Sequence, residues 1–415
     1  MGEVGEPCGR LDIDGGAELS FRLYFAGDGT PEVPVSESRR DHLSEYRELM
    51  KDQPDCRAVV AGFDIWGDYI EAIPYGTGHI NDTFQAAVSQ AGTTVHYTLQ
   101  RINTRVFRDP EGLMENVRRV TAHSQAGLRA SGAPDASRRS LSLVPTLEGG
   151  VLFRDADGGA WRCYRFIEKC STCDVVDSPR KAYEAARAFA RFQGLLADLP
   201  GGRLNETIPD FHHTPKRYAA LHAALQADVK GRAAEAQPEI ERALEMETEA
   251  GRLVDMMAAG EIPERATHND TKINNVLLDD ATGEGLCVID LDTLMPGSAL
   301  YDFGDMVRSA TLNIAEDSTD YQKAFCRRDI FEALAKGFLE GADFLNDAER
   351  ANMAFSGRLM TLECGVRFLT DFLQGDVYFK VRRPGHNLDR CRTQLALAAS
   401  IRDQEKELQA ICTRG

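Results

Sequence analysis

The feature that most constrains the fold of this chain is one β-hairpin pattern that stands among long helical stretches. Its first arm covers residues 273–279, its turn is rich in Asp, Thr and Gly, and its second arm covers residues 285–290. With the turn centred at the Thr-Gly step, Asn275 is predicted to face Asp290, with roughly 5 Å between the two backbones. An amide oxygen and a carboxylate at the open end of a hairpin make an oxygen-rich site of the kind that Mg²⁺ prefers.

A polar loop over residues 267–270 directly precedes the hairpin and ends in Asp270. Phosphoryl transfer needs charge neutralised on the phosphate and a positioned acceptor hydroxyl, and two carboxylates with one asparagine supply both. Asp270 is therefore the predicted catalytic carboxylate, and Asn275 and Asp290 are the predicted metal ligands. Taken alone, Asn275 could simply begin a strand and Asp290 end one. The order of all three is what indicates a phosphotransferase.

Length, charge and hydropathy narrow the class of protein. At 415 residues with 43 % hydrophobic residues, the chain is long enough for two packed lobes. Its formal charge of −17 opposes binding to nucleic acid or to anionic lipid. No run of 18 apolar residues occurs, and the first residues lack the basic start and apolar stretch of a signal peptide. We therefore expect a cytoplasmic protein without nucleic-acid or membrane partners, and we expect it to act as a monomer.

Periodicity divides the chain into a loosely ordered extension over residues 1–55, a first lobe over 56–168 and a helical second lobe over 169–415. In the first lobe, alternation predicts one helix at 110–128 and an antiparallel sheet with strands at 68–74, 80–88, 95–103, 150–154 and 160–168. In the second, helical spacing predicts helices from 179 onward and near 216–228, 238–259, 303–314, 327–342 and 348–373. The predicted fold class is α+β.

The polar loop and the hairpin carry a resemblance to a known family. The run HNDTKINN at 268–275, with an Ile-Asp pair that ends in Asp290, resembles the motifs of the aminoglycoside phosphotransferase and choline kinase-like group, which is related to protein kinases. The resemblance implies a bilobal protein-kinase-like fold and a kinase that uses ATP and Mg²⁺. It also implies that Asp270 orients or deprotonates the acceptor hydroxyl, that Asn275 and Asp290 hold Mg²⁺, and that His268 braces the loop.

Two aspartates beyond the hairpin need a separate interpretation. Asp292 could contact a second metal ion or have a hydrogen-bonding role, and both alternatives stay open. Asp302 begins an Asp-Phe-Gly triplet, which spells the metal motif of protein kinases. Because it comes 27 residues after Asn275 and opens a helical pattern, we predict a structural capping role for Asp302.

The first lobe contains the residues expected to bind ATP. Gly76 and Gly78 lie in the connection between the first two predicted strands, where glycines let backbone amides approach phosphates. Glu168 ends the segment 164–168, the predicted hinge that meets adenine through backbone groups.

The third predicted strand ends where the family resemblance implies a basic residue that grips phosphate and pairs with a glutamate of the following helix. Arg101 replaces the usual lysine, with Gln100 as its rival, and Glu115 is the best partner by spacing. Arginine keeps the positive charge and can bind phosphate through two hydrogen bonds.

A narrower resemblance concerns the phosphate acceptor. Several runs look like those of N-acetylhexosamine 1-kinases, which phosphorylate the anomeric hydroxyl of N-acetylglucosamine or N-acetylgalactosamine. These runs are residues 76–83, 98–103, 267–275, 365–371 and 375–379. On that resemblance Arg367 and Tyr378 are candidate sugar contacts, and His79 and Asn81 could reach the sugar from the glycine-rich loop. The ordinary alternatives are an ion pair of Arg367 with Asp371 and a core position for Tyr378.

Three other functions remain open from the sequence. A kinase of the same fold could act on an aminoglycoside, choline, homoserine or another small alcohol. The unusual Arg101 would also suit a nucleotide-binding pseudokinase, although Asp270, Asn275 and Asp290 argue for catalysis. A metal-dependent hydrolase is less well supported, because the sequence has one compact carboxylate site and no His pair with ligand spacing.

Overall fold

The computed structural model describes residues 54–76 and 80–413. The chain divides into two units, Met1–Asp55 and Cys56–Gly415. The extension predicted over residues 1–55 therefore lies almost wholly outside the described residues. Among the helices that are described, none is long and apolar enough to cross a membrane.

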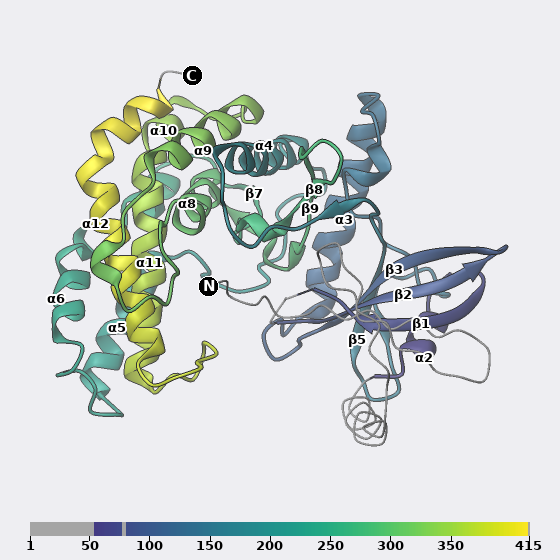
Figure 1. Cartoon of the computed structure of the whole chain (residues 1–415), viewed down its shortest axis with the longest axis horizontal. Helices are drawn as coiled ribbons and strands as arrows, with labels where there is room; N and C mark the ends of the chain where they lie inside the picture. Colours follow the sequence, from purple (N-terminus) through teal and green to yellow (C-terminus); the bar gives the residue numbers. More distant parts are fainter. Residues whose placement is uncertain (1–53, 77–79, 414–415) are drawn as a thin grey trace, which may run out of the picture. The chain divides into compact units, whose positions relative to one another are not determined.

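A small antiparallel sheet forms the first part of the second unit (Figure 1). Its strands, in spatial order, are β1 (Asp68–Pro74), β2 (Asp82–Gln90), β3 (Thr93–Ile102), β5 (Ala160–Arg165) and β4 (Phe153–Arg154). The structure confirms the predicted α+β class with a small antiparallel sheet beside a helical part. The strand bounds differ by a few residues from the predicted ones, and β4 is shorter than expected.

The two faces of this sheet are covered by different elements. On one face Phe84, Leu99 and Trp161 form a buried cluster with α2 (Cys56–Ala61). On the other face Ile102 joins a core that includes α3 (Pro110–Ala130) and the helical lobe. Because successive side chains of a strand point to opposite faces, neighbouring residues of β3 meet different surroundings.

The helix α3 (Pro110–Ala130) shows why the sequence folds as it does at this point. The side chain of Asp109 caps its first turn by accepting from the backbone N–H of Gly112 at 2.9 Å, and a proline occupies the first helical position. Leu113 and Val117, four residues apart, are buried on the face that packs against the core.

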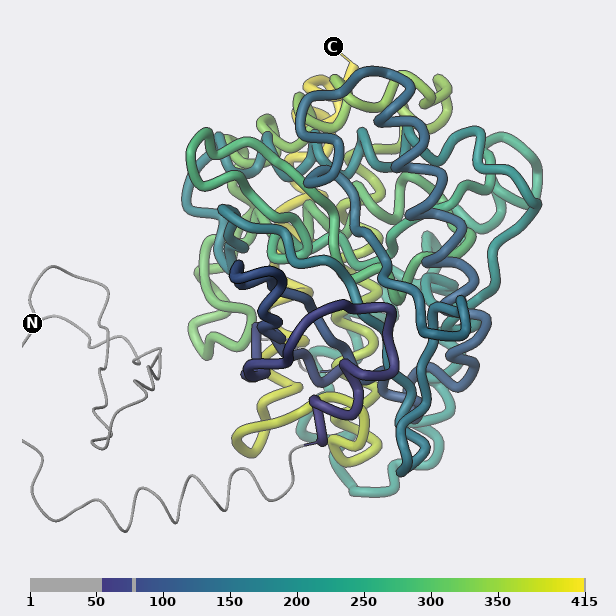
Figure 2. The backbone as a smooth tube through the Cα atoms, turned by 90° about the vertical axis from the view of Figure 1, so that its right-hand side faces the viewer, coloured from purple at the N-terminus to yellow at the C-terminus, as the bar shows by residue number. Residues whose placement is uncertain are grey.

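The second lobe is mainly helical. Its helices are α4 (Pro179–Leu195), α5 (Thr214–Ala227), α6 (Gln237–Glu245), α7 (Arg252–Ala258), α8 (Ala299–Ala310), α9 (Arg328–Gly341), α10 (Asp347–Ala351), α11 (Met353–Gln374) and α12 (His386–Cys412). Helices α11 and α12 pack against each other, and their yellow-green and yellow traces can be followed in Figures 1 and 2. The helix predicted at 238–259 is broken into α6 and α7, with a 3₁₀ turn between them, and α12 lies beyond the predicted ranges.

Short strands cross this lobe and hold the polar loop. They are β6 (Cys170–Ser171), β7 (Arg265–Thr267), β8 (Val276–Asp279), β9 (Gly285–Val288) and β10 (Met295–Gly297). The predicted hairpin is present as β8 and β9, whereas the pairings of β7 with β10 and of β6 with β8 were not predicted.

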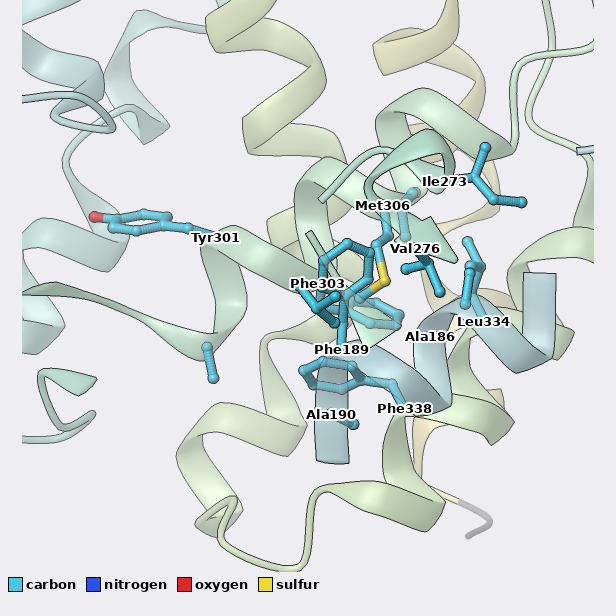
Figure 3. Close-up of a cluster of buried hydrophobic side chains, with 14 of the residues drawn as sticks. Ala186, Phe189, Ala190, Ile273, Val276, Tyr301, Phe303, Met306, Leu334 and Phe338 are labelled. Atoms are coloured by element: carbon cyan, nitrogen blue, oxygen red, sulfur yellow. The ribbon is translucent and has the colours of Figure 1, made fainter. Parts of the chain in front are cut away.

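An apolar core lies next to the polar loop. Phe189 of α4, Val276 of β8, Phe303 of α8 and Phe338 of α9 converge in it, as Figure 3 shows. These four side chains are fully buried. Burial of a large apolar side chain contributes about 1.5–3 kcal/mol, so the elements that carry the polar loop are anchored firmly.

Candidate active site

Asp270 lies in the loop between β7 and the 3₁₀ turn Ile273–Asn275, and two side chains hold its carboxylate. The Nζ of Lys272 lies 2.9 Å from Oδ1 of Asp270. The Nδ2 of Asn275 donates to the backbone oxygen of Asp270 at 2.8 Å and to its Oδ2 at 3.3 Å. Asp270 and Asn275, predicted to share a site, are therefore in direct contact.

The hairpin register differs by one residue from the predicted one. Val276 of β8 pairs with Val288 of β9, and the backbone oxygen of Asn275 accepts from the N–H of Ile289 at 2.9 Å. Asp290 follows the end of β9 with a φ of 59°. The predicted cross-strand pairing of Asn275 with Asp290 is thus wrong, because a bulge in β8 and the five-residue connection that follows it shift the register.

The carboxylates of Asp270 and Asp290 have opposite pKa shifts. Desolvation by surrounding protein would raise the pKa of Asp270, but the charge and hydrogen bond of Lys272 outweigh it and lower this pKa to about 2. The side chain of Asp290 reaches solvent, yet desolvation by its neighbours and the charges of Asp292 and Asp270 raise its pKa to about 6. Asp270 is therefore ionised at neutral pH, whereas the carboxylate of Asp290 forms no ion pair with a described residue.

His268 and Asp302 brace the loop from the core side. The Nε2 of His268 lies 2.8 Å from the backbone oxygen of Ile289, and its ring packs edge-on against Phe189 with 5.3 Å between centroids. Asp302 accepts from the backbone N–H groups of His268 at 2.9 Å and Asn269 at 2.6 Å. These contacts stabilise the left-handed backbone of Asn269, whose φ is 65°.

The Asp-Phe-Gly triplet has a structural role, as predicted, but it is not a helix cap. Ser298 caps α8 by accepting from the backbone N–H of Leu300 at 3.2 Å, and Asp302 lies in the first turn of α8. Phe303 belongs to the core. Gly304 lies so close to α11 that a Cβ atom there would come within 2.4 Å of the backbone oxygen of Ser356. Helix packing therefore explains this glycine.

The residues predicted to bind ATP lie partly within the described part of the chain. Gly76 has a φ of 82°, and a Cβ atom there would meet no described atom within 4 Å, whereas Gly78 and His79 lie outside the described residues. Tyr75, just before Gly76, meets Phe166 of the predicted hinge edge-on at 5.4 Å. Glu168, at the end of that hinge, pairs with His96 of β3. The start of the glycine-rich connection and the hinge thus meet.

The expected ion pair of Arg101 with Glu115 is not formed. Arg101 pairs with Asp82 of β2, where its Nε donates at 2.8 Å, and its guanidinium lies 5.8 Å from the ring centre of Trp161. Glu115 instead pairs with Arg118 on the same helix. The reason is strand alternation, which turns Arg101 to the sheet face that packs on α2.

Sequence reasoning missed Arg162 of β5. Its side chain is fully buried, forms an ion pair with Asp292, and donates from Nε to Gln100 at 2.9 Å. Asp292, for which two roles remained open, is thus engaged in an ion pair. The available signal was an arginine inside the otherwise apolar strand segment Trp161–Tyr164, since a charged residue in a buried strand needs a specific partner.

Asn81, predicted as an acceptor contact, lies at the same cluster. Its Nδ2 donates to Oδ2 of Asp292 at 2.5 Å, and its Oδ1 accepts from the backbone N–H of Asn103 at 2.9 Å. Asn81 therefore joins the sheet to the segment after the hairpin.

Arg367 and Tyr378 lie together. Arg367 does not form the ion pair suggested for it, and Tyr378 is not part of the core. The guanidinium of Arg367 lies over the rings of Phe211, Tyr378 and Phe379, at 5.4, 5.8 and 5.4 Å from their centres. Tyr378 is 63 % exposed, so it is not a core residue. Asp371, the suggested partner of Arg367, accepts instead from three consecutive backbone N–H groups that begin at residue 377.

The residues predicted to hold Mg²⁺ have the donor atoms that it requires. Because Nδ2 of Asn275 points at Asp270, its Oδ1 faces elsewhere, and no described residue donates to it. The carboxylate of Asp290 likewise accepts no hydrogen bond from the described residues. Hard oxygen atoms without donors suit Mg²⁺, which also binds the oxygens of substrate phosphates. In the described part of the chain, no three His, Cys, Asp or Glu side chains converge as a metal site of their own.

Comparison with known proteins identifies the family. The model of the phosphotransferase enzyme family matches residues 71–339, which is more than half of the chain. The chain belongs to this family. The matched segment contains the loop of Asp270 and the hairpin.

One solved structure shows the same fold, and two others are similar to this chain to a lesser degree. An aminoglycoside phosphotransferase from Alicyclobacillus acidocaldarius is 12 % identical, with a TM-score of 0.55, over 86 % of this chain and 98 % of its own. An ethanolamine kinase from Plasmodium vivax is 12 % identical, with a TM-score of 0.48, over 87 % of this chain and 95 % of its own. A choline kinase from Cryptosporidium parvum is 14 % identical, with a TM-score of 0.47, over 89 % of this chain and 97 % of its own.

Proposed function

We propose that this phosphotransferase transfers the γ-phosphoryl group of ATP to the anomeric hydroxyl of an N-acetylhexosamine, which yields the sugar 1-phosphate. The observation that carries the phosphotransfer is the arrangement around Asp270. Its ionised carboxylate lies between Lys272 and Asn275, next to the unpaired carboxylate of Asp290. This arrangement supplies an acceptor for a hydroxyl proton beside oxygen donors for a metal ion.

In this proposal Asn275 and Asp290 hold Mg²⁺, which when bound neutralises charge on the phosphates. Asp270 accepts a hydrogen bond from the attacking hydroxyl and so orients it. A carboxylate with a pKa of about 2 is a weak base, so Asp270 acts mainly by orientation and takes the proton late. This suits a loose phosphoryl-transfer transition state, in which positioning matters more than base strength. Lys272 keeps Asp270 ionised, and His268 and Asp302 hold the loop in place.

The surroundings of Arg367 support a neutral sugar as the acceptor. The guanidinium can donate to ring hydroxyls or to an acetamido oxygen, and the exposed ring of Tyr378 offers a flat face with a polar tip. Asp371 supports the position of Tyr378, because it binds that residue's backbone N–H at 2.8 Å.

A cationic acceptor, such as choline or an aminoglycoside, is less well supported by the same region. It would need unpaired carboxylates, and the three candidates near the C-terminus are all engaged. Asp371 binds backbone N–H groups, Asp376 pairs with Arg232 at 2.6 Å, and Asp389 pairs with Arg392 at 3.2 Å. Arg367 itself fills the aromatic cluster that could otherwise receive a cationic ligand.

The experiment that tests this function is ATP consumption with Mg²⁺ over a panel of acceptors, with Asp270→Asn as the blank. The panel contains both N-acetylhexosamines, glucose, galactose, choline, homoserine and kanamycin. We expect turnover with one or both N-acetylhexosamines, together with loss of the reducing end, because phosphate on the anomeric oxygen blocks it. Turnover with another acceptor alone would overturn the sugar assignment. Binding of ATP without turnover on any acceptor would favour the pseudokinase.

A further inference from the structure

A row of polar side chains crosses one face of the antiparallel sheet. Thr83 of β2 lies opposite Gln100 of β3, and Gln100 lies opposite Arg162 of β5. The row is hydrogen-bonded throughout: Gln100 donates to Thr83 at 3.0 Å and accepts from Arg162 at 2.9 Å. Directly opposed residues of antiparallel strands share a face. All three side chains therefore lie on the face that Ile102 shares with the helical lobe.

Arg162 lies at the end of this row, and its guanidinium group has one donor atom that is not hydrogen-bonded to the described residues. Its Nε binds Gln100 and its Nη1 binds Asp292, but its buried Nη2 has no partner among the described residues. Leaving a buried donor unsatisfied costs about 1–3 kcal/mol, so such an atom in a native structure requires an explanation.

The position of Arg162 points to an anionic ligand. Its ion-pair partner Asp292 lies only two residues after Asp290 in the chain, and both partners of the pair are buried. Asp290 is exposed to solvent, so the segment from Asp290 to Asp292 joins a solvent-facing carboxylate to the partner of the buried guanidinium. A guanidinium suits this place because its planar donors match two oxygens of a phosphate.

The other cations near the site are already engaged. Arg101 points to the opposite face of the sheet, where it binds Asp82. Lys272 binds Asp270, and Arg308 binds Asp305 at 2.8 Å. Of these four cations, Arg162 is the one with a buried donor that has no partner among the described residues.

We propose that Arg162 of β5 binds the phosphates of ATP, in place of a basic residue of β3. Gln100 occupies the β3 position on this face and orients the guanidinium through its Nε, while Asp292 holds Nη1, which leaves Nη2 for a phosphate oxygen. This inference rests on the proposed function, because it requires that ATP binds at this site.

The test measures nucleotide binding by calorimetry in EDTA and without acceptor, so that neither a metal contact of Asp292 nor turnover takes part. The readout is the ratio of the affinities for ATP and adenosine, which share the adenine and ribose contacts. We expect Arg162→Met to lower this ratio at least about tenfold, because a charge-assisted bond to phosphate is lost. Arg154→Met is the matched control, since Arg154 of β4 pairs with Glu111 at the exposed edge of the same sheet.

A second pair of variants separates phosphate binding from folding. It is needed because Arg162→Met alone leaves the buried carboxylate of Asp292 without its ion-pair partner. Asp292→Asn and the double variant R162M/D292N both lack that carboxylate and differ only at residue 162. We expect D292N to keep the preference for ATP over adenosine and the double variant to lose it. The thermal stability of the double variant should nevertheless be higher than that of R162M. The inference would be overturned if R162M had the same ratio of ATP to adenosine affinity as the unmodified protein. It would also be overturned if the double variant recovered that ratio. A larger loss in R101M than in R162M would do the same.

This experiment also separates the inference from the proposed function. If the unmodified protein binds ATP and R162M binds it equally well, the inference fails and the kinase assignment stands. If the unmodified protein binds ATP neither in EDTA nor with Mg²⁺, the proposed function itself fails.

Discussion

The ammonium group of Lys272 lies 2.9 Å from the carboxylate of Asp270, two residues earlier in the same loop. The pair is asymmetric in its surroundings, because Lys272 is more exposed than Asp270. Lys272 supplies the nearest positive charge to the predicted catalytic group, and it lowers the pKa of that group against the effect of desolvation.

We predict that Lys272→Met shifts the acidic limb of the pH–activity profile to higher pH. Without the ammonium group the pKa of Asp270 rises from about 2, so Asp270 becomes protonated at a higher pH and activity is lost earlier on acidification. At neutral pH we expect kcat/KM to fall about tenfold, or about 1.4 kcal/mol, because a hydrogen bond to a charged group is lost. Lys323→Met removes an exposed lysine paired with Asp320 and serves as the control. An unshifted acidic limb would contradict the role of Lys272.

The second prediction concerns the two predicted catalytic-site carboxylates. Asp270→Asn and Asp290→Asn should each lower turnover at least about a hundredfold, or about 2.7 kcal/mol of transition-state stabilisation. Neither change should unfold the protein, because both side chains lie outside the apolar core. Turnover is compared with that of Asp343→Asn, an exposed aspartate on another surface, and thermal unfolding verifies the fold. Near-normal turnover in either folded variant would refute its assigned role.

Asp302→Asn should loosen the loop that carries Asp270. The carboxylate accepts from the backbone N–H groups of His268 and Asn269, and an amide in its place turns an NH₂ group toward at least one of those donors. We expect a loss of about 2–3 kcal/mol in the free energy of unfolding, measured with urea, and a lower kcat. Asp343→Asn is again the control. If Asp302 contributed only to the stability of the fold, the free energy of unfolding would fall but kcat in the folded protein would not.

A buried His–Glu pair behind the loop should make stability depend on pH. His212 lies between Glu363, at 2.8 Å from its Nδ1, and the backbone oxygen of Asn269, at 2.9 Å from its Nε2. Burial would lower the pKa of His212, but the charge of Glu363 outweighs it and raises this pKa above 6.5. Burial would likewise raise the pKa of Glu363, but His212 outweighs it and lowers this pKa below 4.5.

The sign follows from these two shifts. A raised histidine pKa stabilises the fold below pH 6.5, and this contribution is lost as the pH rises through the raised value. A lowered glutamate pKa stabilises the fold above pH 4.5, and this contribution is lost as the pH falls through the lowered value. Urea unfolding between pH 4 and 9 should therefore give lower stability at both ends. His212→Gln should remove the alkaline decline, whereas His222→Gln, which breaks an exposed pair with Glu247, should leave it intact.

Arg367→Met should weaken acceptor binding and leave ATP binding unchanged. Removal of the guanidinium takes away the donors proposed for the sugar, so we expect the acceptor KM to rise about tenfold, or about 1.4 kcal/mol. The KM for ATP should stay within about twofold. Arg252→Met is the control, because Arg252 lies over the ring of Phe355, at 4.4 Å, on another part of the helical lobe. Equal changes in both KM values would indicate a structural role for Arg367.

The sequence predicted those parts of the fold that depend on local patterns. The strand-like pattern of residues 68–74 predicted β1 with its observed bounds, and the helical pattern that begins at Pro110 predicted the start of α3. The β8–β9 hairpin and the helical nature of the second lobe were also predicted. The register of the hairpin was wrong by one residue, because a bulge cannot be read from alternation over four residues.

The candidate site likewise has a part that local sequence patterns predicted and a part that depends on long-range packing. The sequence alone predicted that Asp270, Asn275 and Asp290 belong to one site, because short chain distances and the hairpin pattern bring them together, and the structure shows Asp270 and Asn275 in contact. Only the tertiary structure decided which arginine of the sheet pairs with Asp292, two residues after Asp290. Arg101 and Arg162 lie on neighbouring strands, and strand pairing turns the first toward α2 and the second toward Asp292, which is 130 residues away in the chain. That choice depends on register and on long-range packing, and neither is contained in a local pattern of residues.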